Sequence, residues 1–190
     1  VKKGAIFVTA IDKFPLITKD VPGFLVNKVL TPYMFDAMAR VEKGESMEKI
    51  DEAARAFGMP MGPIELCDSV GLDVCEHVAK TLGGGVPEDT QLAKLVAAGK
   101  LGKKTGQGFY EWAEGRPKKT GATFPKEELA RLGRDLVEPM IREAQKSLDE
   151  GVVENADLVD AGMIFGTGFA PFRGGPLYYR QHEAKSGAAG

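Results

Sequence analysis

The chain has 190 residues, and its 25 lysine and arginine residues nearly balance its 27 aspartate and glutamate residues, for a net charge of −2. This length accommodates one large domain or two small ones. Hydrophobic residues make up 43% of the chain and charged residues 27%, a composition that supports a packed core and excludes an intrinsically disordered protein. The balanced charge argues against a nucleic-acid-binding surface, and no apolar run approaches the ~20 residues that cross a membrane.

Cysteine and glycine usage narrow the class of protein further. The two cysteines, Cys67 and Cys75, are too few for a disulfide-stapled secreted protein, so we expect a cytoplasmic location. They are predicted to share one helix face, eight residues apart, without reaching bonding distance. None of the 24 glycines form the G-x-G-x-x-G fingerprint of a dinucleotide site. No cluster of side chains has metal-ligand spacing, so no metal is expected.

The first 20 residues are expected to be the tail of a domain that is encoded upstream. Residues 1–12 are compatible with the end of a helix, and the run from Pro15 to Lys19 has the composition of a short strand. A turn at residues 20–23 closes this run. Because a single strand lacks a partner for its hydrogen bonds, it would lie at the edge of an upstream sheet.

Four helices are predicted after this segment. The first covers residues 24–41, is apolar on several sides, and is expected to end near Gly44. The second covers Ser46 to Phe57, with Ser46 as its N-cap. The third runs from Pro63 to about Leu82, and the fourth covers residues 90–99.

A glycine-rich loop follows at residues 101–108 and leads into the aromatic residues of segment 109–112. We expect a tight turn that docks these aromatic residues on the helices as a strand or anchor. Lys103 and Lys104 could instead contact a phosphate group. Their spacing from the glycines does not match the phosphate-binding P-loop, which favours the tight turn.

The second half of the chain repeats the first. A polar linker over residues 113–125 leads into a long amphipathic helix over residues 127–150, interrupted by Pro139. Five residues recur at an offset of 107 or 108 positions: Pro32, Ala37 and Gly44 as Pro139, Ala144 and Gly151, and Gly58 and Pro63 as Gly166 and Pro171. This pattern predicts a duplicated helical unit, with copies over residues 21–112 and 126–183. Residues 184–190 are expected to form a frayed tail.

Three residues are candidates for a functional site. Asn27 stands in an otherwise apolar helix start, where a buried amide requires hydrogen-bond partners. It either ties the helix to a neighbouring loop or fixes a substrate oxygen or a catalytic imidazole. Met61 and Pro63 lie at a glycine and proline turn, where they either pack in the core or line an apolar pocket.

Four motifs in a fixed order resemble one family. They are D-V-P-G-F-L-V-N-K at residues 20–28, P-M-G-P-I-E-L-C-D-S-V-G-L-D at residues 60–73, G-K-K-T-G-Q-G-F-Y at residues 102–110 and G-T-G-F-A-P-F-R-G-G at residues 166–175. Over residues 12–180 the chain resembles the C-terminal helical region of 3-hydroxyacyl-CoA dehydrogenase. The presence of two repeats is most similar to the multifunctional fatty-acid oxidation enzymes.

This resemblance implies a fold class and an incomplete site. The fold would be mainly α, with two tandem modules like the C-terminal domain of 6-phosphogluconate dehydrogenase, after a short helix and strand remnant of a Rossmann domain. In the family an upstream Rossmann domain binds NAD and supplies a His–Glu pair as general base, so no cofactor is expected on this chain itself. His77 and His182 do not lie in the motif that carries this base.

The resemblance also implies roles for the candidate residues. Asn27 matches the asparagine that hydrogen-bonds the 3-oxygen of the substrate, and the turn at Met61 and Pro63 would lie near the acyl chain. Lys28 stands where the family usually has arginine, so a bidentate contact at that position is not expected.

The function implied is the substrate-binding half of an NAD-dependent L-3-hydroxyacyl-CoA dehydrogenase in fatty-acid β-oxidation, inactive without its NAD domain. Its partners would be an acyl-CoA and its own upstream domain. The alternative is a non-catalytic helical association module, with the two repeats forming an internal pseudo-dimer or with the chain forming a homodimer.

Overall fold

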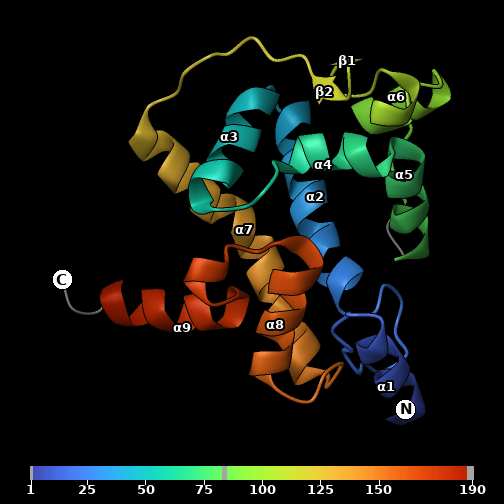
Figure 1. The fold of residues 1–190 in the computed structure, drawn as a ribbon. Coiled ribbons are helices and arrows are strands. Elements are labelled where there is room, and N and C mark those ends of the chain that lie inside the picture. The colour runs from blue at the N-terminus through green and yellow to red at the C-terminus, as the bar shows by residue number, and fades with distance from the viewer. Residues whose placement is uncertain (1, 83–84, 188–190) are drawn as a thin grey trace. The chain divides into compact units, whose positions relative to one another are not determined.

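The computed structural model describes residues 2–82 and 85–187, which are mostly helical (Figure 1). The helices are α1 (Lys2–Ala10), α2 (Val26–Glu42), α3 (Met47–Phe57), α4 (Pro63–Val70), α5 (Leu72–Thr81), α6 (Gln91–Ala97), α7 (Lys126–Asp149), α8 (Ala156–Thr167) and α9 (Pro176–Gly187). Two 3-10 turns, η1 (Lys103–Thr105) and η2 (Pro171–Arg173), and an antiparallel pair of strands, β1 (Trp112–Ala113) and β2 (Arg116–Pro117), complete the elements. The predicted mainly α fold is confirmed.

The chain forms two compact units. One contains the residues up to Leu30 together with those from Met140 onward, and the other contains Thr31–Pro139. The boundaries fall inside α2 and α7, next to the prolines that both helices contain, Pro32 and Pro139. Each unit therefore contains parts of both predicted repeats.

In the unit Thr31–Pro139, the core lies among α2, α3, α4 and the first part of α7. Its fully buried side chains include Tyr33, Ile50 and Leu136. Ser46 caps α3 as predicted, because its Oγ accepts a hydrogen bond from Lys49 N at 3.4 Å. Gly133 of α7 lies so close to α3 that a Cβ there would be 2.5 Å from the Ala53 carbonyl oxygen. The start of α7 is thus packed tightly on α3.

The other unit shows the reciprocal arrangement. A Cβ on Gly162 of α8 would lie 2.9 Å from Leu25 Cδ2, and one on Gly166 would lie 2.7 Å from Val26 Cγ2. The start of α2 therefore packs on α8, just as the start of α7 packs on α3. In each unit the long helix of one repeat begins against the second helix of the other repeat.

The repeat itself is visible as the series α2, α3, α4 followed by α7, α8, α9. Asp51 of α3 accepts hydrogen bonds from the first backbone N–H groups of α4, and Asp160 of α8 does the same for α9. Two of the predicted correspondences are wrong. Gly58, the left-handed C-cap of α3, corresponds to Gly168 rather than Gly166, and Pro63 corresponds to Pro176 at the start of α9 rather than to Pro171. The turn η2 is inserted between α8 and α9, which displaces the second copy.

Two further predictions about secondary structure are wrong, and a third stays a prediction. The run from Pro15 to Lys19 has no partner strand within the described residues, where Lys19 N donates a backbone hydrogen bond to Val152 O; its pairing with an upstream sheet stays a prediction. The predicted third helix is divided into α4 and α5 by Gly71, whose backbone has φ +108° and ψ 129°. Helix α7 continues through Pro139 without interruption.

The last helix and the hydropathy of the helices bear on two further expectations. Helix α9 runs to Gly187, beyond the expected end of the second repeat at residue 183, and residues 188–190 of the expected frayed tail lie outside the described residues. Within the described part of the chain, no helix has both the length and the apolar character that a membrane span requires.

Candidate functional site

Asn27 is the second residue of α2 and follows a tight turn. Phe24 N donates a hydrogen bond to Val21 O at 2.9 Å, and Gly23, with φ +77°, provides the left-handed conformation that the turn requires. Lys28 N also donates to Gly23 O, at 3.4 Å. The side chain of Asn27 is exposed, so the expectation of a buried amide is wrong. A short turn thus presents the Asn27 side chain on the outside of the first turn of α2.

Charged contacts fix this helix start to the end of α7. The Lys28 ammonium pairs with the carboxylate of Glu150 and lies 3.5 Å from that of Glu143. Lys19 adds a hydrogen bond from Nζ to Glu150 O at 2.9 Å. The hydrogen bond from Lys28 lowers the pKa of Glu150. Two separate carboxylates suit the point charge of lysine, so these contacts do not require the planar fork of an arginine.

Met61 and Pro63 lie on the turn between α3 and α4. Pro63 is buried at the first position of α4, where its missing N–H leaves no helical hydrogen bond unmade. Met61 is half-buried, and its Sδ accepts a hydrogen bond from Ser69 Oγ at 3.7 Å. Pro63 is therefore a core residue, whereas Met61 retains exposed surface. The structure brings these two together in the unit Thr31–Pro139, and Asn27 belongs to the other unit.

A fully buried carboxylate, that of Asp51, organises this turn. Asp51 Oδ1 accepts hydrogen bonds from Ile64 N at 2.9 Å and Glu65 N at 3.5 Å, which satisfies the free donors at the start of α4. Asp51 Oδ2 accepts a hydrogen bond from the Tyr110 hydroxyl at 2.7 Å. Burial raises the pKa of Asp51 to about 6, against the opposing effects of the Tyr110 hydrogen bond and the charge of Lys119.

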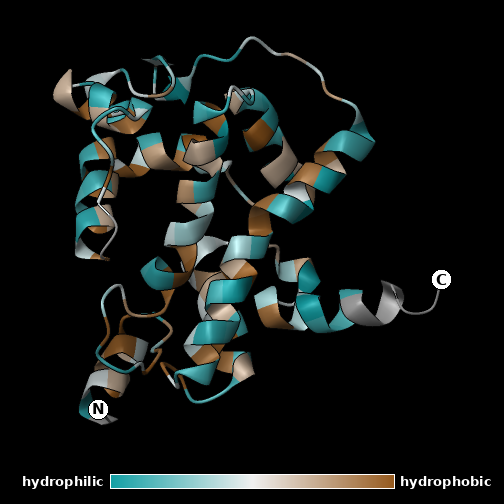
Figure 2. Ribbon diagram, turned by 180° about the vertical axis from the view of Figure 1, so that it is seen from behind, coloured by the Kyte–Doolittle hydropathy of each residue, from teal (hydrophilic) through white to brown (hydrophobic). Residues whose placement is uncertain are grey.

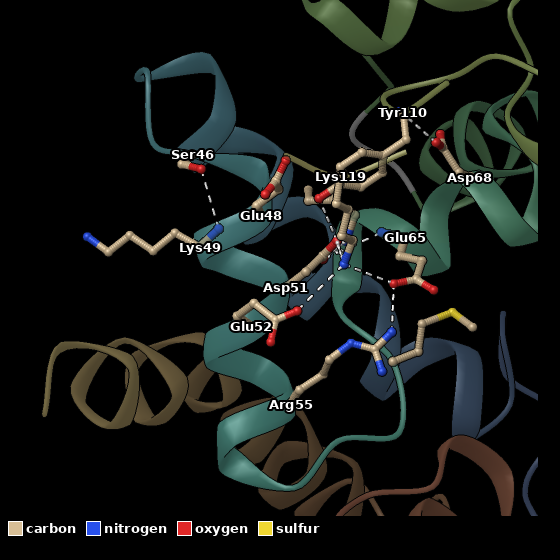
Figure 3. Close-up of polar contacts among 12 residues, drawn as sticks. Ser46, Glu48, Lys49, Asp51, Glu52, Arg55, Glu65, Asp68, Tyr110 and Lys119 are labelled. Atoms are coloured by element: carbon tan, nitrogen blue, oxygen red, sulfur yellow. Dashed lines mark hydrogen bonds and ion pairs between the residues drawn. The ribbon is translucent and has the colours of Figure 1, made fainter. Parts of the chain in front are cut away.

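Lys119 connects the linker to this carboxylate and to two others. Figure 3 shows its ammonium among the carboxylates of Asp51, Glu52 and Glu65, with Nζ–O distances of 3.7, 3.8 and 3.2 Å. Arg55 donates to Glu65 at 2.7 Å and to Pro60 O at 3.1 Å. Burial tends to raise the pKa of Glu65, but the contacts with Arg55 and Lys119 outweigh it and leave this pKa lowered. The turn that carries Met61 is thus held from both sides.

Asp68 of α4 holds the segment after the glycine-rich loop by accepting its hydrogen bonds, as Asp51 does for the start of α4. Its carboxylate accepts hydrogen bonds from Phe109 N, Tyr110 N and Trp112 Nε1, each at 2.9 Å. Burial raises the pKa of Asp68, although these hydrogen bonds oppose the shift. The predicted tight turn that docks aromatic residues on the helices is confirmed.

The loop lysines make contacts within the same region. Lys104 Nζ lies 2.5 Å from Asp73 Oδ1, and Lys103 Nζ lies 5.5 Å from the centre of the Trp112 ring. Both lysines therefore contribute to the docking of the loop. These contacts give no support to the alternative of a phosphate site at Lys103 and Lys104.

The sequence did not identify three buried aspartates, Asp51, Asp68 and Asp160. A signal was available, because each aspartate stands next to apolar positions of a predicted helix or repeat. A buried carboxylate needs hydrogen-bond donors, and in all three cases the donors include backbone N–H groups more than ten residues away in sequence. Hydrophobic periodicity alone does not reveal such partners.

The raised pKa of Asp51 predicts a pH-dependent stability. Between its ordinary pKa of 3.8 and about 6, the folded chain binds more protons at this site than the unfolded chain, so the contribution of Asp51 to stability falls as the pH rises through this window. Asp51→Asn cannot ionise but keeps an oxygen to accept from Ile64 N. We therefore expect the difference in free energy of unfolding to shift in favour of the variant by on the order of 2–3 kcal/mol between pH ~4 and ~7.

Urea unfolding of both proteins at the two pH values measures this difference. The other titrating groups are common to both proteins, so their effects cancel to first order. An equal difference at both pH values would show that Asp51 does not titrate in this range.

Comparison with known proteins supports a common family for the N-terminal repeat. Residues 23–112 match the sequence model of the family described as 3-hydroxyacyl-CoA dehydrogenase, C-terminal domain. The fatty acid oxidation complex subunit alpha of Idiomarina loihiensis is 36% identical over 193 residues, which cover 91% of this chain and 27% of that protein. The chain thus spans about a quarter of the length of the curated relatives it matches.

Solved structures show a related fold. The 3-hydroxybutyryl-CoA dehydrogenase of Escherichia coli matches 95% of this chain and 57% of its own, with a TM-score of 0.76 and 23% identity, which establishes similarity of fold. The (S)-3-hydroxybutyryl-CoA dehydrogenase PaaH1 of Ralstonia eutropha is 32% identical, with a TM-score of 0.54, over 60% of this chain and 42% of its own. Residues 23–112 therefore match the family of 3-hydroxyacyl-CoA dehydrogenase C-terminal domains, and 91% of the chain is similar to the subunit alpha of a fatty acid oxidation complex.

Proposed function

We propose that this chain is the substrate-side helical part of an NAD-dependent L-3-hydroxyacyl-CoA dehydrogenase that acts in fatty-acid β-oxidation. The observation that carries the proposal is the placement of Asn27. It lies in the segment that matches the family, on the exposed side of the first turn of α2. The turn before it and the Lys28 ion pairs after it restrict the directions in which the amide can point.

The proposed role of Asn27 is to hold the 3-oxygen of the acyl-CoA. An amide N–H that donates to this oxygen would keep the substrate oriented while the hydroxyl loses its proton and the adjacent carbon loses a hydride. Met61, with its exposed surface and flexible thioether, is proposed to line the acyl chain. Pro63 would support Met61 from the core instead of touching the substrate.

NAD, which would accept the hydride, does not fit the residues of this chain. The sheet in the described residues is an antiparallel pair of two-residue strands, which offers no parallel strand edge of the kind that binds a dinucleotide. The base and the cofactor site would therefore belong to a further domain. Relatives about four times as long as this chain support such a domain.

Exposed hydrophobic side chains support a partner for the N-terminal segment. Figure 2 shows the hydrophobic residues of α1 and of the segment after it. The exposed large side chains here are Ile6, Phe7, Ile11, Phe14 and Ile17. Exposed apolar groups in this number are typical of a surface that another domain covers, and we propose the NAD-binding domain as that cover.

A helical association module remains the second candidate. The reciprocal packing, in which α7 begins on α3 and α2 begins on α8, supports an internal pseudo-dimer of the two repeats. Such a module would use α2 for packing and would need no amide at residue 27. The two candidates therefore make opposite predictions for Asn27.

Asn27→Ala in the full-length enzyme is expected to lower kcat/KM by roughly 10- to 100-fold, because the 3-oxygen would lose a hydrogen bond that strengthens in the transition state. The thermal midpoint should change little, since the side chain is exposed. Steady-state kinetics with acetoacetyl-CoA and NADH, together with thermal unfolding, measure both quantities.

Asn155 provides the matched control, because its side chain caps α8 by accepting from Leu158 N at 3.0 Å. Asn155→Ala is expected to cost about 1 kcal/mol of stability and to leave the rate nearly unchanged. If Asn27→Ala behaves like Asn155→Ala, with a loss of stability and no specific loss of rate, the association module is the better description.

A further inference from the structure

Cys67 and Cys75, the two cysteines of the chain, lie together on either side of the helix break at Gly71. In one continuous helix, residues eight positions apart would be separated by about 12 Å along the axis. The chain instead ends α4 at Val70 and starts α5 at Leu72. The prediction that one continuous helix carries both cysteines is therefore wrong, whereas both cysteines are free, as expected.

The contacts between the two residues are direct. Cys75 Sγ donates to Cys67 O at 3.9 Å. The same carbonyl of Cys67 accepts from Gly71 N at 2.9 Å, and Gly71 O accepts from Cys75 N at 3.1 Å. The break at Gly71 thus fixes the backbone positions that bring the Cys75 sulfur against Cys67.

We propose that Cys67 and Cys75 are a redox modification site that closes to an intramolecular disulfide when a peroxide oxidises the chain. Cys67 is fully buried and Cys75 is 4% exposed, so Cys75 is the sulfur that meets the oxidant first. Its sulfur attacks one peroxide oxygen, the O–O bond breaks, and a sulfenic acid and one water form. The sulfur of Cys67 then attacks the sulfur of Cys75, and the hydroxyl leaves as a second water. The two thiols lose two electrons and two protons in total, which the peroxide takes up.

The geometry favours a bond between these two residues over other products. A disulfide requires the two sulfur atoms to approach to ~2.05 Å. The Cys75 sulfur already lies 3.9 Å from the carbonyl oxygen of Cys67, and no other cysteine competes in this chain. Burial hinders a large thiol such as glutathione from attacking Cys75, whereas a peroxide is small enough to enter. The resolving thiol belongs to the residue that the Cys75 sulfur already contacts, which limits further oxidation.

Formation of the disulfide is expected to change the contacts of the glycine-rich loop. Cys67 is followed directly by Asp68, whose carboxylate holds Phe109 N, Tyr110 N and Trp112 Nε1. A new covalent link between α4 and α5 would shift Asp68 relative to these donors. Trp112 is the one tryptophan of the chain, so its emission reports on this loop specifically.

The test uses the full chain, reduced and then treated with hydrogen peroxide. We expect an intact mass lower by two hydrogens, the loss of both free thiols in denaturant, a monomeric species on a non-reducing gel, and a shift of Trp112 emission that dithiothreitol reverses. Two free thiols after oxidation, oxygen added to one sulfur alone, or a disulfide between two chains would overturn the proposal. An unchanged Trp112 emission in the disulfide form would overturn the coupling to Asp68.

Variants that lack one cysteine are the matched controls for the emission change. The mass measurement on the wild-type chain tests disulfide formation independently of these variants. Cys67→Ala and Cys75→Ala should each retain one thiol and show no reversible shift of Trp112 emission under the same treatment. A reversible shift of wild-type size in either variant would show that the emission change does not depend on the disulfide and would overturn the link to this pair.

Discussion

Replacing Asp68 with alanine is expected to lower the free energy of unfolding by about 3–5 kcal/mol. The carboxylate accepts three hydrogen bonds from Phe109 N, Tyr110 N and Trp112 Nε1. Phe109, Tyr110 and Trp112 are all buried, so the variant would leave their donors without an acceptor and out of reach of water. A buried donor that loses its partner costs about 1–3 kcal/mol.

Asp68→Asn distinguishes the effect of the Asp68 charge on stability from the effect of its side-chain volume. The amide preserves the volume and one oxygen, but its NH2 group would face donors that need an acceptor. We expect this variant to fall between the wild type and Asp68→Ala. Urea unfolding followed by far-ultraviolet circular dichroism measures all three proteins, with Lys104→Ala as a control that removes only an exposed ion pair with Asp73. A loss below ~1 kcal/mol in Asp68→Ala would show that the loop can find other acceptors.

The helices and their caps could be predicted from sequence because their signals are local. Ser46 was identified as the N-cap of α3 from its position before an apolar period, and the cap hydrogen bond to Lys49 N is present. Predictions failed where a distant partner decides the conformation. Gly71 stands inside a helical pattern, and the division into α4 and α5 depends on its backbone and on Leu72 N, which donates to Leu101 O.

The candidate site shows the same limit. The motif around Asn27 identified the residue, yet its exposure depends on the turn at residues 21–24 and was not predicted. The sequence predicts the same role for Met61 and Pro63, because both lie on one turn. Their different burial depends on how α4 packs, which leaves the Met61 thioether half-buried and places Pro63 in the core. Hydrophobic periodicity indicates which face of a helix is buried, but not which polar group shares that face.

Both copies of the duplicated unit contain the same pairing of a buried aspartate with a glycine, so the contribution of this pairing to stability can be tested twice. Each copy has a buried aspartate on its second helix, Asp51 or Asp160, and a glycine immediately before the proline that starts its third helix, Gly62 or Gly175. A Cβ at Gly62 would lie 2.2 Å from Asp51 Oδ1, and one at Gly175 would lie 2.3 Å from Asp160 Cβ. Glycine is thus required at both positions because the aspartate needs to reach the backbone of the following helix.

Gly62→Ala is expected to destabilise the chain by about 3–4 kcal/mol, because a contact at 2.2 Å has to displace Asp51 from Ile64 N and Tyr110. Gly175→Ala is expected to cost about 1 kcal/mol more, because its φ of +103° adds backbone strain for any residue with a Cβ. Thermal and urea unfolding measure both losses, and loss of folded protein on expression would be the extreme form of the same result.

Gly44→Ala measures the cost of a positive φ for a residue with a Cβ, without the steric contact that a Cβ makes at Gly62 or Gly175. Gly44 also has a positive φ, +88°, but no atom lies within 4 Å of a Cβ placed there. This variant should lose only about 1 kcal/mol. If Gly62→Ala is no worse than Gly44→Ala, Asp51 can give way without cost, and the requirement for glycine before α4 and α9 would then not come from the buried aspartates.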